Sequence, residues 1–248
     1  MPASELTFEL VNEEGFDAIP APLGEGMRCQ TCDYWERLDG HRDRADAAAA
    51  RDLKLSRLLA GRRLAGAYGM LAWQTDAAGD RVAVGWAQFG PISVYPRAQA
   101  IRDRYHALPD SPAPWVITCL QVPAGQAGRD QIGTALLVAV CAELDRRGII
   151  AVEAYPEGIP DPWSRSPGPA SLYLASGFAQ ADGDERYPAY RRELAIDSTE
   201  VGWADLLSHT KRDDEGDDWP LPLPKGPSED DLFRLPERPR RPNPFGDD

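Results

Sequence analysis

Histidine and cysteine are scarce in this sequence, which holds three histidines and four cysteines in 248 residues. The HExxH pattern of zinc proteases, the P-loop of nucleotide hydrolases and a Ser–His–Asp order are all missing. The sequence also lacks an apolar run of the roughly 18 residues that cross a membrane as a helix. Its first residues lack the basic start and apolar core of a secretory signal peptide. We therefore expect a cytoplasmic protein that does not insert into a membrane.

Basic residues are in the minority, because 27 lysines and arginines stand against 40 aspartates and glutamates. The formal net charge is −13. Such a chain repels the phosphates of nucleic acids, so we do not expect a nucleic-acid partner. The negative electrostatic potential of such a chain favours cationic substrates, and amines are the simplest members of that class.

The four cysteines fall into two kinds. Cys119 and Cys141 lie in apolar segments and are expected to be small core residues. Cys29 and Cys32 have the CxxC spacing of zinc and redox sites, but a second such pair is absent and His41 is the nearest further ligand. We expect a reduced, partly buried pair in a cytosolic setting and predict no metal.

The most informative stretch begins with an apolar, β-branched run at Trp115–Val122 and a small-residue loop at Pro123–Gly133. The run predicts a buried strand. Ile132–Arg147 predicts a helix, since apolar residues recur once per turn and Gly148 follows as an αL cap. Ile149–Tyr155 predicts a second strand. In such a β-loop-α-β unit, free N–H groups at the helix start form an anion site suited to a phosphate or pyrophosphate.

The rest of the chain predicts further elements around this unit. Tyr68–Trp73 and Arg81–Phe89 predict a β-hairpin with turn residues between them. The proline-rich loop Glu157–Pro169 follows the second strand of the unit; it is either a wall of a substrate crevice or a surface excursion. The remaining expectations are a loop over residues 1–26, one or two helices within 42–64, a short polar connection at Pro96–Leu108 that is either helical or irregular, a helix at Ala170–Ser176 and a strand at Arg186–Leu194.

Composition divides the chain into three parts. Residues 1–40 are a cysteine-containing extension, 41–197 the main domain, and 198–248 an acidic, proline-rich tail expected to be extended or disordered. Apolar residues within the tail leave packing on a protein partner open, and a homodimer is also compatible with the sequence.

Several segments of the chain together resemble one enzyme superfamily. They are Val116–Val122, Gly128–Gly133 with Ala135–Leu137, Val152–Pro156, Leu172–Phe178 and Tyr187–Leu194. In this order they resemble the acyl-CoA N-acyltransferases of the Gcn5-related (GNAT) superfamily, over roughly residues 66–194. The resemblance implies a single α/β (α+β) domain with a central mixed, mostly antiparallel sheet flanked by helices, to which the N-terminal cap and the tail are added.

The resemblance also implies a function. The expected reaction is acetyl transfer from the cosubstrate acetyl-CoA to a primary amine, carried by a small molecule or a peptide. The alternative is a catalytically idle domain of the same fold that acts as an interaction module through its N-terminal cysteine segment or its tail.

The residues that would hold CoA follow from the same resemblance. The superfamily loop usually reads Gln/Arg-x-x-Gly-x-Gly/Ala; here Gly128 and Gln131 depart from it, Gly133 fits, and Arg129 offers a cation one position out of register. Splaying of the central strand would expose backbone N–H groups to the pantetheine arm. The expected cofactor-binding residues are Leu120, Val122, Gly128, Arg129, Asp130, Gln131, Ile132, Gly133 and Thr134.

Two residues are candidates for proton transfer. Tyr173 stands four residues before Gly177, where many superfamily members carry a tyrosine that protonates the CoA sulfur. Its alternative role is that of a packing aromatic. Glu153 lies in the predicted second strand and would be a base acting through water if its face lines the cleft; otherwise it is an exposed charge or an ion-pair partner.

Overall fold

The computed structural model describes residues 6–21, 28–38, 47–62 and 66–194. The expectations for the tail, residues 198–248, and for His41 lie outside the described residues. The elements are β1 (Thr7–Leu10), α1 (Glu13–Phe16), α2 (Ala47–Ala60), β2 (Gly69–Thr75), β3 (Arg81–Pro91), η1 (Ile92–Val94), α4 (Pro96–Arg102), β4 (Trp115–Gln121), α5 (Arg129–Arg146), β5 (Ala151–Ala154), η2 (Pro162–Ser164), α6 (Ala170–Ala175), β6 (Ala179–Gly183) and β7 (Pro188–Glu193).

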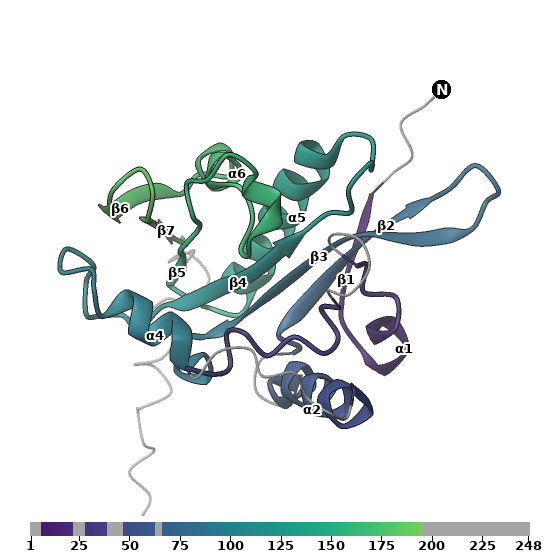
Figure 1. The fold of residues 1–248 in the computed structure, drawn as a ribbon, viewed down its shortest axis with the longest axis horizontal. Helices are drawn as coiled ribbons and strands as arrows, with labels where there is room; N and C mark the ends of the chain where they lie inside the picture. The colour runs from purple at the N-terminus through teal and green to yellow at the C-terminus, as the bar shows by residue number, and fades with distance from the viewer. Residues whose placement is uncertain (1–5, 22–27, 39–46, 63–65, 195–248) are drawn as a thin grey trace, which may run out of the picture. The chain divides into compact units, whose positions relative to one another are not determined.

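One seven-stranded sheet organises these elements (Figure 1), in the order β1-β2-β3-β4-β5-β7-β6. All neighbouring strands run antiparallel except β4 and β5, which are parallel. The expected fold class, a mixed and mostly antiparallel sheet flanked by helices, is confirmed. Within the described residues no helix combines the length and the apolar character that crossing a membrane requires.

The predicted hairpin is confirmed as β2 and β3. Asp76 closes the turn, because its backbone N–H donates to the carbonyl of Asp80 and its side chain accepts from the N–H groups of Ala78 and Asp80, both at 2.9 Å. Gly79 takes a φ of +91°, a conformation that glycine adopts without strain. The turn residues therefore fix the register of the two strands.

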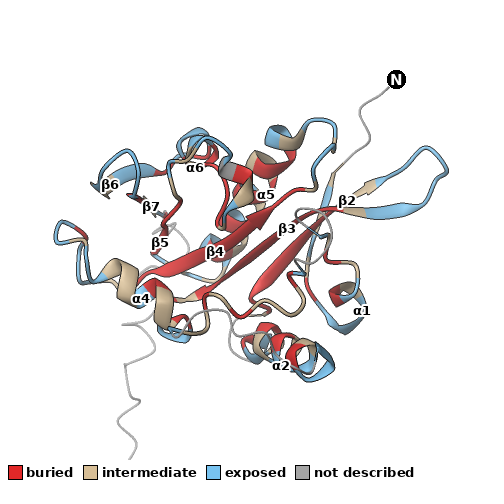
Figure 2. Ribbon diagram, in the orientation of Figure 1, coloured by how far each residue is buried: buried red, intermediate tan, exposed pale blue. Residues whose placement is uncertain are grey.

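Helices cover both faces of the sheet. The Cα of Gly85 in β3 faces Ile132 and Leu136 of α5, whereas the side chain of Gln88 bonds Lys54 of α2. Because side chains alternate along a strand, α5 and α2 lie on opposite faces. Buried residues concentrate in the central strands between them (Figure 2), and every residue of β4 is buried.

A β-bulge interrupts β4 beside β3. Gln88 stands opposite Cys119 and the next residue, Phe89, stands opposite Ile117, so that Thr118 has no partner of its own. The Thr118 hydroxyl instead donates to the carbonyl of Gln88 at 3.4 Å. Such an extra residue bends its strand and increases the local twist. The bend comes immediately after the only two positions at which β4 pairs with β5 among the described residues.

One expectation drawn from the sequence was wrong in part, and one strand was not foreseen. Part of the supposed loop at residues 1–26 forms β1, the edge strand beside β2, and the short helix α1, whose N-cap Asn12 accepts from the N–H of Gly15. The polar strand β6 was not expected at all. Its exposed residues carry little hydrophobic pattern, and pairing with β7 rather than burial defines it.

Candidate functional site

The site is the gap that opens between β4 and β5. The two strands pair at Trp115 with Val152 and at Val116 with Glu153, and β4 then continues to Gln121 without β5 beside it. Backbone polar groups alternate between the two edges of a strand. The edge of β4 that carries the carbonyls of Thr118, Leu120 and Val122 is therefore left for other partners. Leu120 and Val122, expected to contact a cofactor, are fully buried at this edge.

The N-terminus of α5 lies at the end of the same edge. The helix begins at Arg129, three residues earlier than expected, with Gly128 as its N-cap at a φ of +68°. The first helical bond runs from the N–H of Ile132 to the carbonyl of Gly128, so the N–H groups of residues 129–131 precede the helix ladder. Gly133 and Thr134 lie inside that ladder, because helical N–H groups bond the carbonyl four residues before.

Arg129 joins the helix start to the end of β4. Its Nε donates to the carbonyl of Val122 at 2.8 Å, and its guanidinium lies 4.4 Å from the centre of the Trp163 ring. Burial lowers the pKa of Arg129, against the opposing effect of Asp161 and Asp130. Its Nη2 is buried and has no hydrogen-bond partner among the residues that the structure describes. The arrangement presents an unsatisfied cationic donor beside a positive helix terminus.

The loop that follows β5 covers this edge; we call residues 163–168 the covering segment. Ser166 Oγ donates to the carbonyl of Thr118 and accepts from Trp35 Nε1 at 3.2 Å. Gly168 has a φ of +87° and passes so close to β4 that a Cβ on it would stand 2.9 Å from the carbonyl oxygen of Leu120. The covering segment thus occupies the free edge of β4.

Trp163 extends the cover to the N-terminus of α5. Its Nε1 donates to Asp130 Oδ1 at 3.1 Å. A Cβ on Gly133 would stand 2.9 Å from the Trp163 ring and 2.7 Å from Leu172. Glycine at position 133 therefore allows close packing of α5 under Trp163 and α6, which is a structural reason for the residue that the loop pattern had singled out.

Tyr173 bonds the covering segment from helix α6. It is fully buried in α6, and its hydroxyl donates to the carbonyl of Pro167 at 2.7 Å. Its ring stacks on Tyr190 and meets Phe178 edge-on. Burial raises the pKa of Tyr173 well above its ordinary value, so the phenol stays protonated at neutral pH.

Glu153 is the centre of a buried charge cluster. It accepts from Arg102 Nε at 3.1 Å, from Arg191 Nη1 at 2.6 Å and from the hydroxyl of Tyr155. Its side chain is fully buried, and burial together with Glu153 raises the pKa of Tyr155. The two arginines come from α4 and β7, so Glu153 ties these elements to β5. This geometry matches the ion-pair alternative for Glu153.

Cys29 contacts Cys119 of β4 on the face of the sheet that α2 covers. A hydrogen bond from the Cys29 thiol lowers the pKa of Cys119 and raises the pKa of Cys29. Burial raises the pKa of Cys141 to about 11. All four cysteines are free thiols. Among the residues that the structure places, no group of three or more His, Cys, Asp or Glu side chains could hold a metal ion.

The sequence did not predict the roles of Trp163 and Ser166. Both lie in the proline-rich loop that was expected to be either a crevice wall or a surface excursion, and its high proline content was the only signal. The contacts of Trp163 and Ser166 join residues 33 and 48 positions apart.

Comparisons with known proteins bear on the fold. No protein-family model matches the sequence, and no curated protein matches it. The chain is similar to solved structures of acetyltransferases. A putative GNAT-family acetyltransferase of Desulfovibrio desulfuricans has 17% identity and a TM-score of 0.42, with 78% of this chain and 100% of that chain covered. An N-acetyltransferase of Staphylococcus aureus has 14% identity and a TM-score of 0.47, with 77% and 100% covered.

A third solved structure is a GNAT-family N-acetyltransferase of Escherichia coli in complex with CoA, with 18% identity and a TM-score of 0.40. The match covers 81% of this chain and 88% of the Escherichia coli chain. The strand order and the single parallel pair that separates at a bulge decide the architecture. They agree with the GNAT-type fold that the sequence resemblance implied. The segments on which the sequence resemblance rested form β4, α5, β5, α6 and β7.

Proposed function

We propose that the protein is an acyl-CoA-dependent N-acyltransferase that moves an acetyl group from acetyl-CoA to a primary amine. In this reaction the amine nitrogen bonds the acetyl carbon, the carbon–sulfur bond breaks, the amine loses a proton and the departing thiolate gains one. The GNAT-type fold and the negative net charge support the proposal.

One observation supports cofactor binding above the others. The unpartnered Nη2 of Arg129 lies beside the first N–H groups of α5 and at the end of the free β4 edge. An unsatisfied buried donor raises the free energy of the fold, and a phosphate oxygen would satisfy it. A pyrophosphate at the α5 terminus would therefore engage Arg129, while the pantetheine arm would follow β4 toward Thr118.

Cofactor binding along β4 requires the covering segment to leave that edge. Ser166 and Gly168 take up the positions beside Thr118 and Leu120 that the pantetheine arm would use. Displacement of the segment would also release the Tyr173 hydroxyl from Pro167, at the place where a departing thiolate needs a proton. We therefore propose Tyr173 as the general acid of the open state. Glu153 is proposed as a structural ion-pair partner and not as the base.

The covered edge also supports a second candidate function. A domain whose β4 edge stays covered would not bind CoA and would act as an interaction module. The two functions differ in one measurable property, which is affinity for acetyl-CoA.

Calorimetric titration of the full chain with acetyl-CoA tests the proposal. We expect binding, and acetyl transfer when a pool of primary amines is added. Gln131→Glu places a negative charge at the start of α5, where Gln131 is exposed. An acidic residue favours the helix there but repels a pyrophosphate, so affinity should fall about fivefold to tenfold with no loss of stability.

Gln99→Glu is the matched control, because Gln99 is exposed on α4 and the change in net charge is the same. It should leave acetyl-CoA affinity unchanged. Absence of binding by the parent chain at millimolar acetyl-CoA would contradict the enzyme and support the interaction module.

A further inference from the structure

A pocket of about 240 Å³ opens on the α2 face of the sheet, outside the gap between β4 and β5. Its floor consists of Glu36, Leu58, Tyr68, Gln88 and Tyr95, and Arg57, Ala60 and Val94 complete the lining. Ala60 and Val94 are exposed, whereas Leu58 and Tyr95 are buried, so the pocket runs from the surface down to β3. This volume is below the range of drug-sized ligand sites, about 300–1,000 Å³, and suits a small metabolite.

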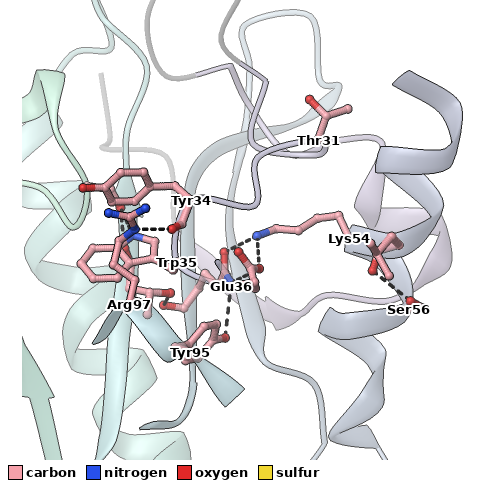
Figure 3. Close-up of polar contacts among 12 residues, drawn as sticks. Thr31, Tyr34, Trp35, Glu36, Lys54, Ser56, Tyr95 and Arg97 are labelled. Atoms are coloured by element: carbon pink, nitrogen blue, oxygen red, sulfur yellow. Dashed lines mark hydrogen bonds and ion pairs between the residues drawn. The ribbon is translucent and has the colours of Figure 1, made fainter. Parts of the chain in front are cut away.

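A buried polar cluster forms one side of the pocket (Figure 3). Lys54 Nζ reaches from α2 to Glu36 Oε1 at 2.6 Å and to Gln88 Oε1 at 2.7 Å. Gln88 Nε2 donates to Glu36 Oε1 at 3.0 Å and to the hydroxyl of Tyr95 at 3.3 Å. Both donors therefore converge on one oxygen of the Glu36 carboxylate.

Among the described residues, the other oxygen of Glu36 has no partner. Its Oε2 atom is buried and makes no hydrogen bond to a described residue. The Glu36 side chain as a whole is only 5% exposed, so water does not readily replace the missing donor. A buried charged acceptor that lacks a hydrogen bond destabilises a fold more than a buried neutral acceptor that lacks one. Glu36 lines the pocket, so a ligand there that presents an ammonium or amine N–H would bring a donor to this carboxylate.

The charges around the pocket exclude a simple cation as the best ligand. Lys54 already balances Glu36, and Arg57 adds a positive charge that has no counterpart in the lining. A ligand that directs its amine to Glu36 and an anionic group to Arg57 would satisfy both. A carboxylate is the anion whose planar geometry matches a guanidinium. The remaining walls, Leu58, Tyr68 and Val94, are apolar or aromatic.

We infer that this pocket binds the acyl acceptor, and that the acceptor is a zwitterion of the amino-acid class with an apolar side chain. The inference rests on the proposed acetyl transfer. The pocket floor adjoins β4, because the carbonyl of Gln88 accepts from the hydroxyl of Thr118. Trp35, next to Glu36 in the chain, bonds Ser166 of the covering segment. The pocket is therefore linked to the covered edge of β4 through Thr118 and Ser166.

The test measures acceptor binding without acetyl-CoA. The full chain is titrated with L-leucine, with isoamylamine, which lacks the carboxylate, and with isocaproate, which lacks the amine. L-Leucine should bind, and each truncated probe should bind about tenfold more weakly or worse, because one buried charge is left unpaired. No binding of L-leucine, or equal binding of isoamylamine, would overturn the inference. A parallel acetyl-CoA titration keeps this failure distinct from failure of the proposed reaction.

Two variants locate the site. Arg57→Gln should reduce L-leucine affinity about tenfold, to the level of isoamylamine, whereas Arg62→Gln, at an exposed arginine that does not line the pocket, should not. Glu36→Gln should also weaken L-leucine, but it disturbs Lys54, so a thermal unfolding curve accompanies it. If that variant fails to fold, Arg57→Gln decides. Unchanged L-leucine affinity in Arg57→Gln would overturn the placement.

Discussion

The hydroxyl of Tyr173 donates to the carbonyl oxygen of Pro167, 2.7 Å away, and so ties helix α6 to the segment that covers β4. The same side chain is the proposed general acid. These two roles predict different consequences when the hydroxyl is removed, because one belongs to the folded ground state and the other to the transition state.

Tyr173→Phe should lower the free energy of unfolding by about 1–3 kcal/mol, since the buried carbonyl of Pro167 loses its donor. As the proposed acid, the same change should lower the turnover number at least about tenfold, with catalytic efficiency falling in parallel. Denaturant unfolding and steady-state kinetics on one preparation measure both. Tyr190→Phe is the control, because Tyr190 stacks on Tyr173 and is also buried. Turnover within twofold to threefold of the parent would leave Tyr173 a packing residue.

Ser166→Ala should tighten the binding of acetyl-CoA. The variant removes the bond from Ser166 to the carbonyl of Thr118 and so destabilises the covered state alone. A net loss of about 1 kcal/mol in that state shifts the population of the open state, and with it the apparent affinity, about fivefold. Calorimetry compares it with Ser164→Ala, whose hydroxyl bonds Asp161 within the loop and not β4. Weaker binding in Ser166→Ala would show that the segment assists the cofactor instead of covering its site.

Glu153→Gln should destabilise the fold strongly without a specific effect on chemistry. The change leaves Arg102 and Arg191 facing a neutral group in a fully buried site, and breaking a buried ion pair costs about 3–5 kcal/mol. Denaturant unfolding measures the loss. Glu9→Gln is the control; Glu9 pairs with Arg81 at the surface, where both side chains are about half exposed and a loss of about 1 kcal/mol or less is expected. Normal stability with a shifted pH–rate profile would instead support a catalytic base.

Asp182 should contribute to stability at neutral pH and not in acid. Its carboxylate accepts from the backbone N–H groups of Ala107 and Gly183, and these bonds lower its pKa in the folded state. Because the folded value lies below the ordinary value of about 3.9, the contribution is complete above about pH 3.9 and is lost as the pH falls through the folded value. Asp182→Asn should therefore melt at a lower temperature than the parent at pH 7, with the difference narrowing in acid.

The control for this comparison is Asp110→Asn, since Asp110 is exposed in the loop before β4. The melting temperature of Asp110→Asn should equal that of the parent at pH 7 and below pH 3. A difference between Asp182→Asn and the parent that persists unchanged below pH 3 would contradict the assignment of the lowered pKa to these two backbone bonds.

Sequence alone determined the elements whose signals are local. The turn residues Asp76 and Gly79 define the β2–β3 hairpin, and the β-branched run that becomes β4 and the once-per-turn apolar stripe of α5 define the central unit. These signals depend on backbone preference and on a periodicity of two or 3.6 residues, so neighbouring residues suffice to read them.

Tertiary structure decided what the sequence left open. Whether Glu153 faced a cleft or an ion pair depended on Arg102 and Arg191, which lie 51 and 38 positions away. The cover over β4 depends on Ser166 meeting Thr118, and the pocket on Glu36 meeting Lys54. Such contacts arise only when the sheet brings distant segments together, because burial and charge pairing are properties of the packed chain and leave no periodic pattern in the sequence.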